Sequence, residues 1–386
     1  MVHFKVLESY ANNYANNWWE GSYIKLLFPN ANLASQRLSE FLKELGDEEN
    51  QRRFFHKYLQ YKCKNSKHKA VLVDSTGLPN NIHFPLTAIN THGGDTNSEA
   101  RLILVVDRTD KMPLFFRYAA GNIVDVTTLS KTITELSQYG VETKMAIVDA
   151  GYYSDNNVKA LYGNSIAFLT RLTPNRKLYK ELVSNHIDSL QKSEYILKYQ
   201  QRLVHIKRVP VRLFEQYDAH AFVAIDMSRR YDETTKYLKD AIEDKLTPEV
   251  MDEELKKKGV FILLSSEDVE TKDILPMYYT RQAIEQIFDV DKNNVDLLPL
   301  RVHSEQAFRG HLMLTFLASI AYLSFSYFVQ EHHKKVKLNA TGVFSAARNL
   351  KCKVYDNCVL VKEPNKTVSE IAKALGISIP DRMFVV

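Results

Sequence analysis

The stretch Ala70-Val-Leu-Val-Asp74 is a short apolar run that ends in an acid. Such a run between polar segments predicts a buried strand. A second run of the same form, Met145-Ala-Ile-Val-Asp149, follows downstream. A rigid strand that ends beside an open loop is a usual place for reactive groups, so Asp74 and Asp149 are candidates. Each is followed closely by a glycine, which is equally typical of an ordinary turn.

The segments around these two runs complete an α/β pattern. Residues 102–106 and 113–118 predict two strands, and the turn R-T-D-K between them predicts a hairpin. A helix over 126–139 precedes the second acid, and a shorter helix over 156–162 leads to a strand at 166–170. Adjacent strands followed by alternating helices and strands predict a mixed α/β sheet.

Changes in the pattern of apolar and charged residues divide the chain into a core and segments added to that core. The N-terminal part is helical, with a helix that Ser35 is expected to cap and Gly46 to close. Long strands and a charged helical stretch separate the two parts of the core and indicate an inserted β-rich domain. The predicted boundaries are 1–65 for the helical segment, 66–175 for the first core part, 176–260 for the insertion, 261–345 for the second core part with a glutamate helix, and 346–386 for a C-terminal tail.

The composition of the chain is globular. Its 386 residues are 45% hydrophobic and carry a formal net charge of +5, which permits an anionic partner without requiring one. Three cysteines without metal-type spacing suit a reducing cytoplasm. Residues 312–329 are uncharged over a length that could span a membrane, but six of them are polar or tyrosine and no second such segment exists. A helix buried against a sheet is therefore expected, with no membrane partner.

A third acid lies in Y-Y-T-R-Q-A-I-E-Q-I-F-D-V-D-K, residues 278–292. We expect one helix here, beginning near Pro276, which suits a first helical turn. On a regular helix Tyr278, Arg281, Glu285 and Lys292 fall within an arc of about 60°. One interpretation is a solvated strip with an Arg281–Glu285 pair. The other is a strip of functional groups.

Three carboxylates brought together favour the second interpretation. Asp74, Asp149 and Glu285 would repel one another unless a cation neutralised them. Ligand sets made only of oxygen favour Mg²⁺ or Mn²⁺, and two such ions can clamp the attacking and leaving oxygens of a phosphoryl displacement. Arg281 and Lys292 could then hold DNA phosphates beside the metal site.

The chain resembles the DDE transposases of bacterial insertion sequences, specifically insertion-sequence family four. That family has a Y-x2-R-x3-E-x6-K signature, which reads here as Tyr278, Arg281, Glu285 and Lys292 with every spacing met. D-S-T-G at Asp74, I-V-D-A-G-Y-Y at the second acid and a β-rich insertion support the resemblance, which covers about residues 25–385.

The resemblance implies a ribonuclease-H-like fold in which Asp74, Asp149 and Glu285 are catalytic and bind two divalent metals. It implies that Tyr278, Arg281 and Lys292 contact DNA near the cut end. The expected partners are double-stranded transposon ends and target DNA, on which the enzyme forms a homodimer in the bacterial cytoplasm.

Two other functions remain open. The chain could be a catalytically inactive or truncated transposase-derived DNA-binding protein, since only about 70 residues precede Asp74. It could also be a stand-alone nuclease on the same fold. The intact acids argue against the first alternative, and the tyrosine and lysine of the signature argue against the second.

Overall fold

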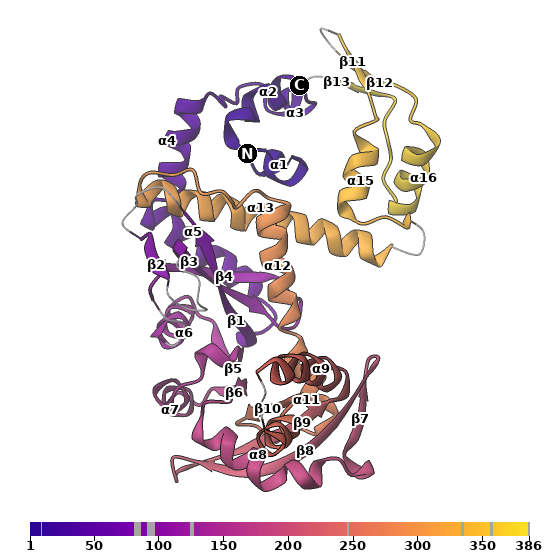
Figure 1. The fold of residues 1–386 in the computed structure, drawn as a ribbon. Coiled ribbons are helices and arrows are strands. Elements are labelled where there is room, and N and C mark those ends of the chain that lie inside the picture. The colour runs from indigo at the N-terminus through magenta and orange to yellow at the C-terminus, as the bar shows by residue number, and fades with distance from the viewer. Residues whose placement is uncertain are drawn as a thin grey trace.

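A computed structural model describes the chain except for residues 9, 81–85, 91–96, 124–126, 245–246, 333–335, 356–357 and 385–386. Figure 1 shows a long helix, α13 (Glu305–Glu331), that crosses the molecule between the N-terminal helices, the sheet and the C-terminal elements. The expected start of a helix at Val126 lies outside the described residues. The helix itself is present as α6 (Leu129–Gln138).

A ten-stranded mixed sheet forms the body of the molecule. Its order is β2-β3-β1-β5-β6-β10-β9-β8-β7, with β4 paired to β3. Its apolar strands supply most of the main core. The strands are β1 (His68–Pro79), β2 (Ala88–Asn90), β3 (Asn97–Asp107), β4 (Pro113–Ala120), β5 (Glu142–Val148), β6 (Ala167–Leu172), β7 (Ile196–Tyr199), β8 (Arg202–Leu213), β9 (Tyr217–Asp226) and β10 (Val260–Ser265).

The first five long strands confirm the predicted ribonuclease-H-like mixed α/β sheet. β1 pairs antiparallel with β3, which forms a hairpin with β4, and β1 pairs in parallel with β5, which is parallel to β6. Helices α6 and α7 (Asp155–Gly163) precede β5 and β6. The parallel connections need such crossover helices, because strands that run the same way cannot be joined by a tight turn.

The strand that carries the first acid is longer than expected. Asp74 was predicted to end its strand, but it lies in the middle of β1, because that strand continues along β3 as far as the pair Pro79↔Glu99. Pairing with β5 nevertheless stops one residue earlier, at Val73↔Val148. Asp74 is therefore at the end of the parallel part of the sheet.

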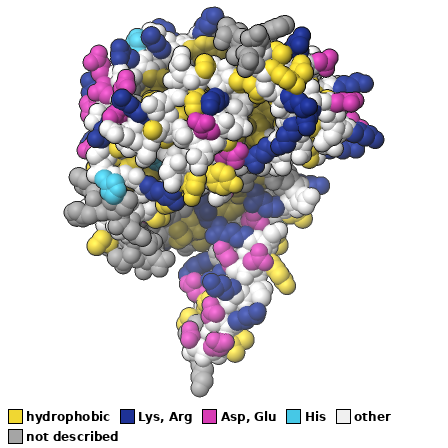
Figure 2. All heavy atoms as spheres, turned by 90° about the horizontal axis from the view of Figure 1, so that it is seen from above, with side chains coloured by type: hydrophobic (Ala, Val, Ile, Leu, Met, Phe, Trp, Pro, Cys, Tyr) yellow, Lys and Arg dark blue, Asp and Glu magenta, His cyan; other side chains and the backbone are white. Residues whose placement is uncertain are grey.

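Residues 176–260 extend the same sheet. β10 lies between β6 and β9, and β9 continues through β8 to β7, all antiparallel. The region also holds three helices, α8 (Lys177–Leu190), α9 (Met227–Glu243) and α10 (Pro248–Lys256). Figure 2 shows, from above, an arm of mixed charge that projects from the body.

The N-terminal helices pack on α13. Gly46 and Gly310 lie at the crossing of α4 and α13, where a Cβ on Gly310 would come within 1.8 Å of the Leu42 carbonyl oxygen. Ser35 is not the cap that we predicted: the N-cap is Ala34, without a side-chain bond, whereas Gly46 does close α4. These helices are α1 (Val2–Leu7), α2 (Ala15–Glu20), α3 (Ile24–Leu27), α4 (Ser35–Leu45) and α5 (Glu48–Lys62).

A buried ion pair ties α1 to the other end of the chain. Lys5 is fully buried and its Nζ donates to an Asp296 carboxylate oxygen at 2.6 Å. Burial lowers the pKa of Lys5, and Asp296 opposes this effect. The pair fixes the first helix against the segment that follows the predicted glutamate helix.

Helix α13 is long and apolar enough to cross a membrane by length and composition. Within its apolar stretch of 18 residues, 56% is buried inside the molecule. It packs against α1, α4, α12, α15 and β4. One such helix is weak support for a membrane span, and the packing is that of a core helix.

The C-terminal residues form a small unit on the end of α13. Helix α15 (Ala340–Ala347) packs on α16 (Lys366–Leu375), and three short strands form a separate antiparallel sheet. The strands are β11 (Cys352–Val354), β12 (Cys358–Val361) and β13 (Arg382–Phe384).

Candidate active site

The register of β1 against β5 brings the first two acids together. Because Val73 pairs with Val148, Asp74 and Asp149 follow at the same level on neighbouring strands. Beyond this point β1 continues, whereas the chain leaves β5 and enters a short 3-10 turn at Ala150. Thr170 on β6 donates from its hydroxyl to the Asp149 carbonyl at 3.2 Å, which holds the loop against the sheet.

The signature stretch is two helices rather than the one helix that we predicted. α11 runs Thr271–Tyr279 and α12 runs Gln282–Asn293, with Arg281 as the N-cap of α12. Pro276 is therefore inside a helix, not in its first turn. At the break the Thr280 hydroxyl donates to the Met277 carbonyl at 2.7 Å, the acceptor that the Arg281 N–H would use in a continuous helix. The Arg281 N–H instead bonds to Tyr278.

Arg281 lies between all three acids. Its guanidinium is 2.7 Å from an Asp74 oxygen, 3.2 Å from an Asp149 oxygen and 3.9 Å from a Glu285 oxygen. It is only 8% exposed. Burial acts to lower the pKa of Arg281, but the two aspartates outweigh burial and raise it. The arginine is thus the counter-ion of the acidic cluster.

The aspartates differ in their surroundings. Burial raises the pKa of Asp74, and Arg281 and the Ser75 N–H oppose that shift. Asp149 is more open, with 46% of its side chain exposed. The Tyr278 hydroxyl, whose pKa burial raises to about 12, donates to Asp149 at 3.4 Å. Glu285, in the first turn of α12, is 61% exposed.

Lys292 is held at the other end of α12. Its ammonium donates to the Thr76 hydroxyl on β1 at 2.7 Å, two residues beyond Asp74. Next to it, Asp291 is buried and accepts a hydrogen bond from Ser319 on α13. Tyr278 and Arg281 therefore contact the acids at one end, and Lys292 contacts β1 at the other end of α12.

The donor set of this cluster fits a divalent metal by chemistry. Three carboxylates share one cation, and one of them is desolvated. In the described part of the chain no group of three His, Cys, Asp or Glu side chains is close enough to hold a metal directly. Arg281 lies between the acids, so Asp74, Asp149 and Glu285 would hold a metal together only if the guanidinium moved away.

A cavity of about 380 Å³ opens beside the cluster, between Asp149, Glu285 and the strands of the 176–260 region. Arg202 in its wall contacts Asp226 at 3.2 Å and lies over the ring of Tyr279, which stacks on Tyr199. The predicted site residues did not include Arg171, Arg202, Asp226, Arg229 or Tyr279. The available signal for Arg171 was a charged residue directly after the predicted strand 166–170.

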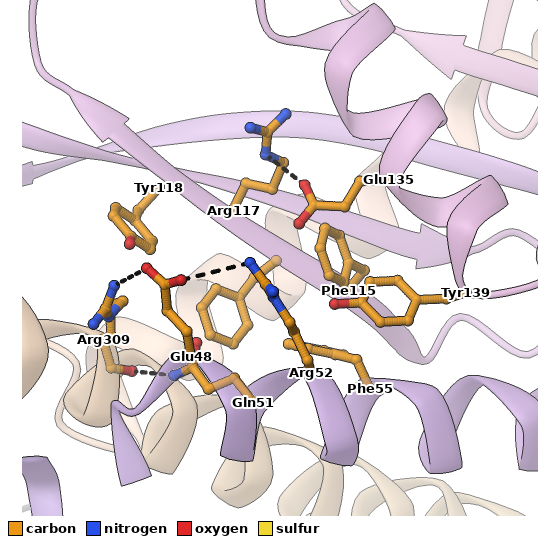
Figure 3. Close-up of a pocket in the computed structure, with 11 residues that line it drawn as sticks. Glu48, Gln51, Arg52, Phe55, Phe115, Arg117, Tyr118, Glu135, Tyr139 and Arg309 are labelled. Atoms are coloured by element: carbon orange, nitrogen blue, oxygen red, sulfur yellow. Dashed lines mark hydrogen bonds and ion pairs between the residues drawn. The ribbon is translucent and has the colours of Figure 1, made fainter. Parts of the chain in front are cut away.

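A second cavity, of about 300 Å³, lies away from the acids between α5, β4, α6 and α13. Figure 3 shows its charged groups joined to one another: Arg309 and Arg52 meet Glu48, and Arg117 meets Glu135. Each of these side chains has an ion-pair partner, although the three arginines exceed the two glutamates by one charge.

Among solved structures, the chain is similar to a piggyBac transposase in a synaptic complex with hairpin DNA, at 12% identity and a TM-score of 0.41, over 82% of this chain and 59% of that one. No curated protein matches its sequence. Residues 65–321, which hold Asp74, Asp149 and Glu285, match the family model of the transposase DDE domain. The chain belongs to the transposase DDE domain family.

Proposed function

We propose that this protein is a metal-dependent DNA transposase that cuts transposon ends and transfers the freed strand to target DNA. The observation that supports the proposal is the convergence of Asp74, Asp149 and Glu285 on one cation position. In this role the three acids are catalytic and hold two Mg²⁺ or Mn²⁺ ions. The bound ions would activate the attacking oxygen and stabilise the leaving oxygen of an in-line displacement.

The charge of the site explains how the same residues would serve in both the metal-free and the metal-bound protein. The three carboxylates and Arg281 together carry about −2, which repels DNA, and two divalent ions reverse that sign. Arg281, displaced from the acids, becomes free to contact a phosphate in a bidentate way. Tyr278 and Lys292 lie on either side of it along the helices and would contact the same DNA end.

We further propose that the protein is of the insertion-sequence family-four type, with its Y-R-E-K signature. It would act on double-stranded DNA as a homodimer that pairs two ends, in the bacterial cytoplasm. The resemblance of the signature, not the structure, supports these finer points.

The test is cleavage of labelled duplexes that carry the inverted repeats flanking the coding sequence, with Mg²⁺ or Mn²⁺. We expect the wild type to cut and Glu285→Gln to lose at least about a hundredfold in rate, because a metal ligand is gone. Asp273→Asn, which removes an exposed acid from the first turn of α11, is the matched control and should retain full activity. Equal cleavage by wild type and Glu285→Gln would refute the assignment.

The same assay separates the alternatives. A transposase-derived DNA-binding protein would bind the ends and leave them uncut. A nuclease would cut but never join the labelled strand to a target plasmid. Joined product that depends on Glu285 is the result that we expect.

A further inference from the structure

The cavity beside the acids is rich in arginine. Arg202, Arg229 and Arg281 all line it, together with Arg171. Three of these four cations have carboxylate partners: Arg202 pairs with Asp226, Arg229 with Glu233, and Arg281 with the acidic cluster. Arg171 is the exception.

Arg171 is placed by the sheet, not by an ion pair. It lies on β6 opposite Leu263 of β10, next to Thr170, which bonds to the Asp149 carbonyl. Its guanidinium lies 5.8 Å from the ring centre of Phe261. Among the residues that the structure describes, no carboxylate forms a salt bridge with it. A half-buried arginine thus lies over a ring, and no described carboxylate forms a salt bridge with it.

Its position relates it to the reacting groups. The Arg171 charge is close enough to act on Tyr278, where it opposes the increase in pKa that burial causes. Tyr278 in turn contacts Asp149. A guanidinium stacked on an aromatic ring keeps its in-plane N–H donors available, and these match two phosphate oxygens.

We propose that Arg171 is a DNA-binding residue: it binds a backbone phosphate next to the scissile one, in the cavity between the acids and β10. This inference rests on the proposed transposase function and adds a contact outside the Y-R-E-K signature. The competing interpretation is that Arg171 only covers Phe261. However, covering that ring needs no charge, and an apolar side chain on β6 would do it equally well.

The experiment compares wild type, Arg171→Gln and Arg171→Lys in binding and cleavage of the labelled end duplexes over a range of salt concentrations. Arg171→Gln should bind about ten- to a hundredfold more weakly, as expected for the loss of a charge-assisted hydrogen bond. When the logarithm of the binding constant is plotted against the logarithm of the salt concentration, the magnitude of the slope should fall by about 0.9. This is the change expected for the loss of one phosphate contact. Arg171→Lys should keep the slope, since the charge remains, with intermediate affinity.

Lys366→Gln is the control for loss of one positive charge. Lys366 is exposed on α16, at the far end of the molecule from β6 and β10 in Figure 1. Circular dichroism melting checks that each variant is folded. If Arg171→Gln keeps the wild-type slope, or if Lys366→Gln shows the same losses, Arg171 has no role in phosphate binding. If the wild type itself neither binds nor cuts the ends, the proposed function fails and the inference fails with it.

Discussion

At the scale of single residues, the main finding is that Arg281 is the counter-ion of the acids. The sequence places Arg281 and Glu285 four apart and allows them to pair, but it cannot show that Asp74 and Asp149 reach the same guanidinium. That contact depends on the register of two strands and on a helix from 130 residues further along the chain. The three acids themselves were accessible from sequence, because each follows a recognisable local pattern.

Removal of that counter-ion should destabilise the metal-free protein. In Arg281→Ala the buried Asp74 loses its partner, so we expect a loss of about 3–5 kcal/mol in the free energy of unfolding. Mg²⁺ should restore part of the loss in the variant and have a smaller effect on the wild type, where the arginine competes with it. Urea unfolding with and without Mg²⁺ measures both quantities.

Arg37→Ala is the comparison for this experiment. Arg37 pairs with Glu40 on the exposed surface of α4, so its removal should cost at most about 1 kcal/mol and should not respond to Mg²⁺. A loss in Arg281→Ala no larger than this would show that Arg281 does not neutralise the cluster.

Asp291 gives a prediction for pH dependence. Burial raises the pKa of Asp291 to about 7, against the opposing effects of Ser319 and Lys292. Its folded pKa is above its unfolded pKa, so its contribution to stability is complete below about pH 4 and is lost as the pH rises through 7. Asp291→Asn keeps an oxygen acceptor for Ser319 and cannot ionise.

We therefore expect Asp291→Asn to be more stable than wild type at pH 8, by a few kcal/mol, and to differ least near pH 4. Denaturant unfolding of both proteins from pH 4 to 8 gives the difference curve. The buried His311, whose pKa is lowered to about 4 by burial, has the opposite slope in both proteins and cancels in that difference. A flat difference curve would rule out titration of Asp291.

At the scale of elements, strands were easier to predict than the helix break. The runs 70–74 and 145–149 show their apolar character locally, and β1 and β5 are where they were expected. The break between α11 and α12 was not visible, because a threonine is compatible with a helix interior. The break is seen only in the structure, where α11 ends at Tyr279 and the Arg281 N–H bonds to the Tyr278 carbonyl.

The crossing of α4 and α13 provides a prediction on packing. Gly310→Ala would place a methyl group against the Leu42 carbonyl and force the helices apart, so we expect a loss of about 1–3 kcal/mol or more. Gly163→Ala, at the end of α7 with open space around its Cβ, should be neutral or stabilising by up to about 1 kcal/mol. Thermal and urea unfolding measure the stability change of both variants. Equal changes for Gly310→Ala and Gly163→Ala would mean that α4 and α13 can move apart at their crossing without a loss of stability.

At the scale of the whole molecule, one sheet connects the acids to the 176–260 region. The predicted insertion has the expected strands, but the sequence could not show that β10 joins them to β6, because pairing between distant strands leaves no local pattern. The cavity lined by Arg171 and Arg202 forms only because β10 pairs with both β6 and β9. This is why the sequence identified the acids but not the residues around them.

Assembly is the prediction that belongs to this scale. We expect the chain to be a 44.5 kDa monomer alone and to form a complex of two chains and two duplexes with end DNA, because strand transfer must bring two ends together. Mass photometry measures both states, with a scrambled duplex of equal length as control. Only one chain per end duplex at saturation would contradict a paired-end complex.

The ion pair between Lys5 and Asp296 has a consequence for synthesis of the protein. The two residues are 291 positions apart, so at ribosomal rates Asp296 is synthesised roughly 15–60 s after Lys5. Until Asp296 is synthesised, α1 cannot form the ion pair that fixes it in its final place. Strands β1 to β6, in contrast, are synthesised before Asp296. Helix α1 is thus synthesised long before it is expected to dock, and a nascent chain halted before Asp296 should leave α1 open to protease.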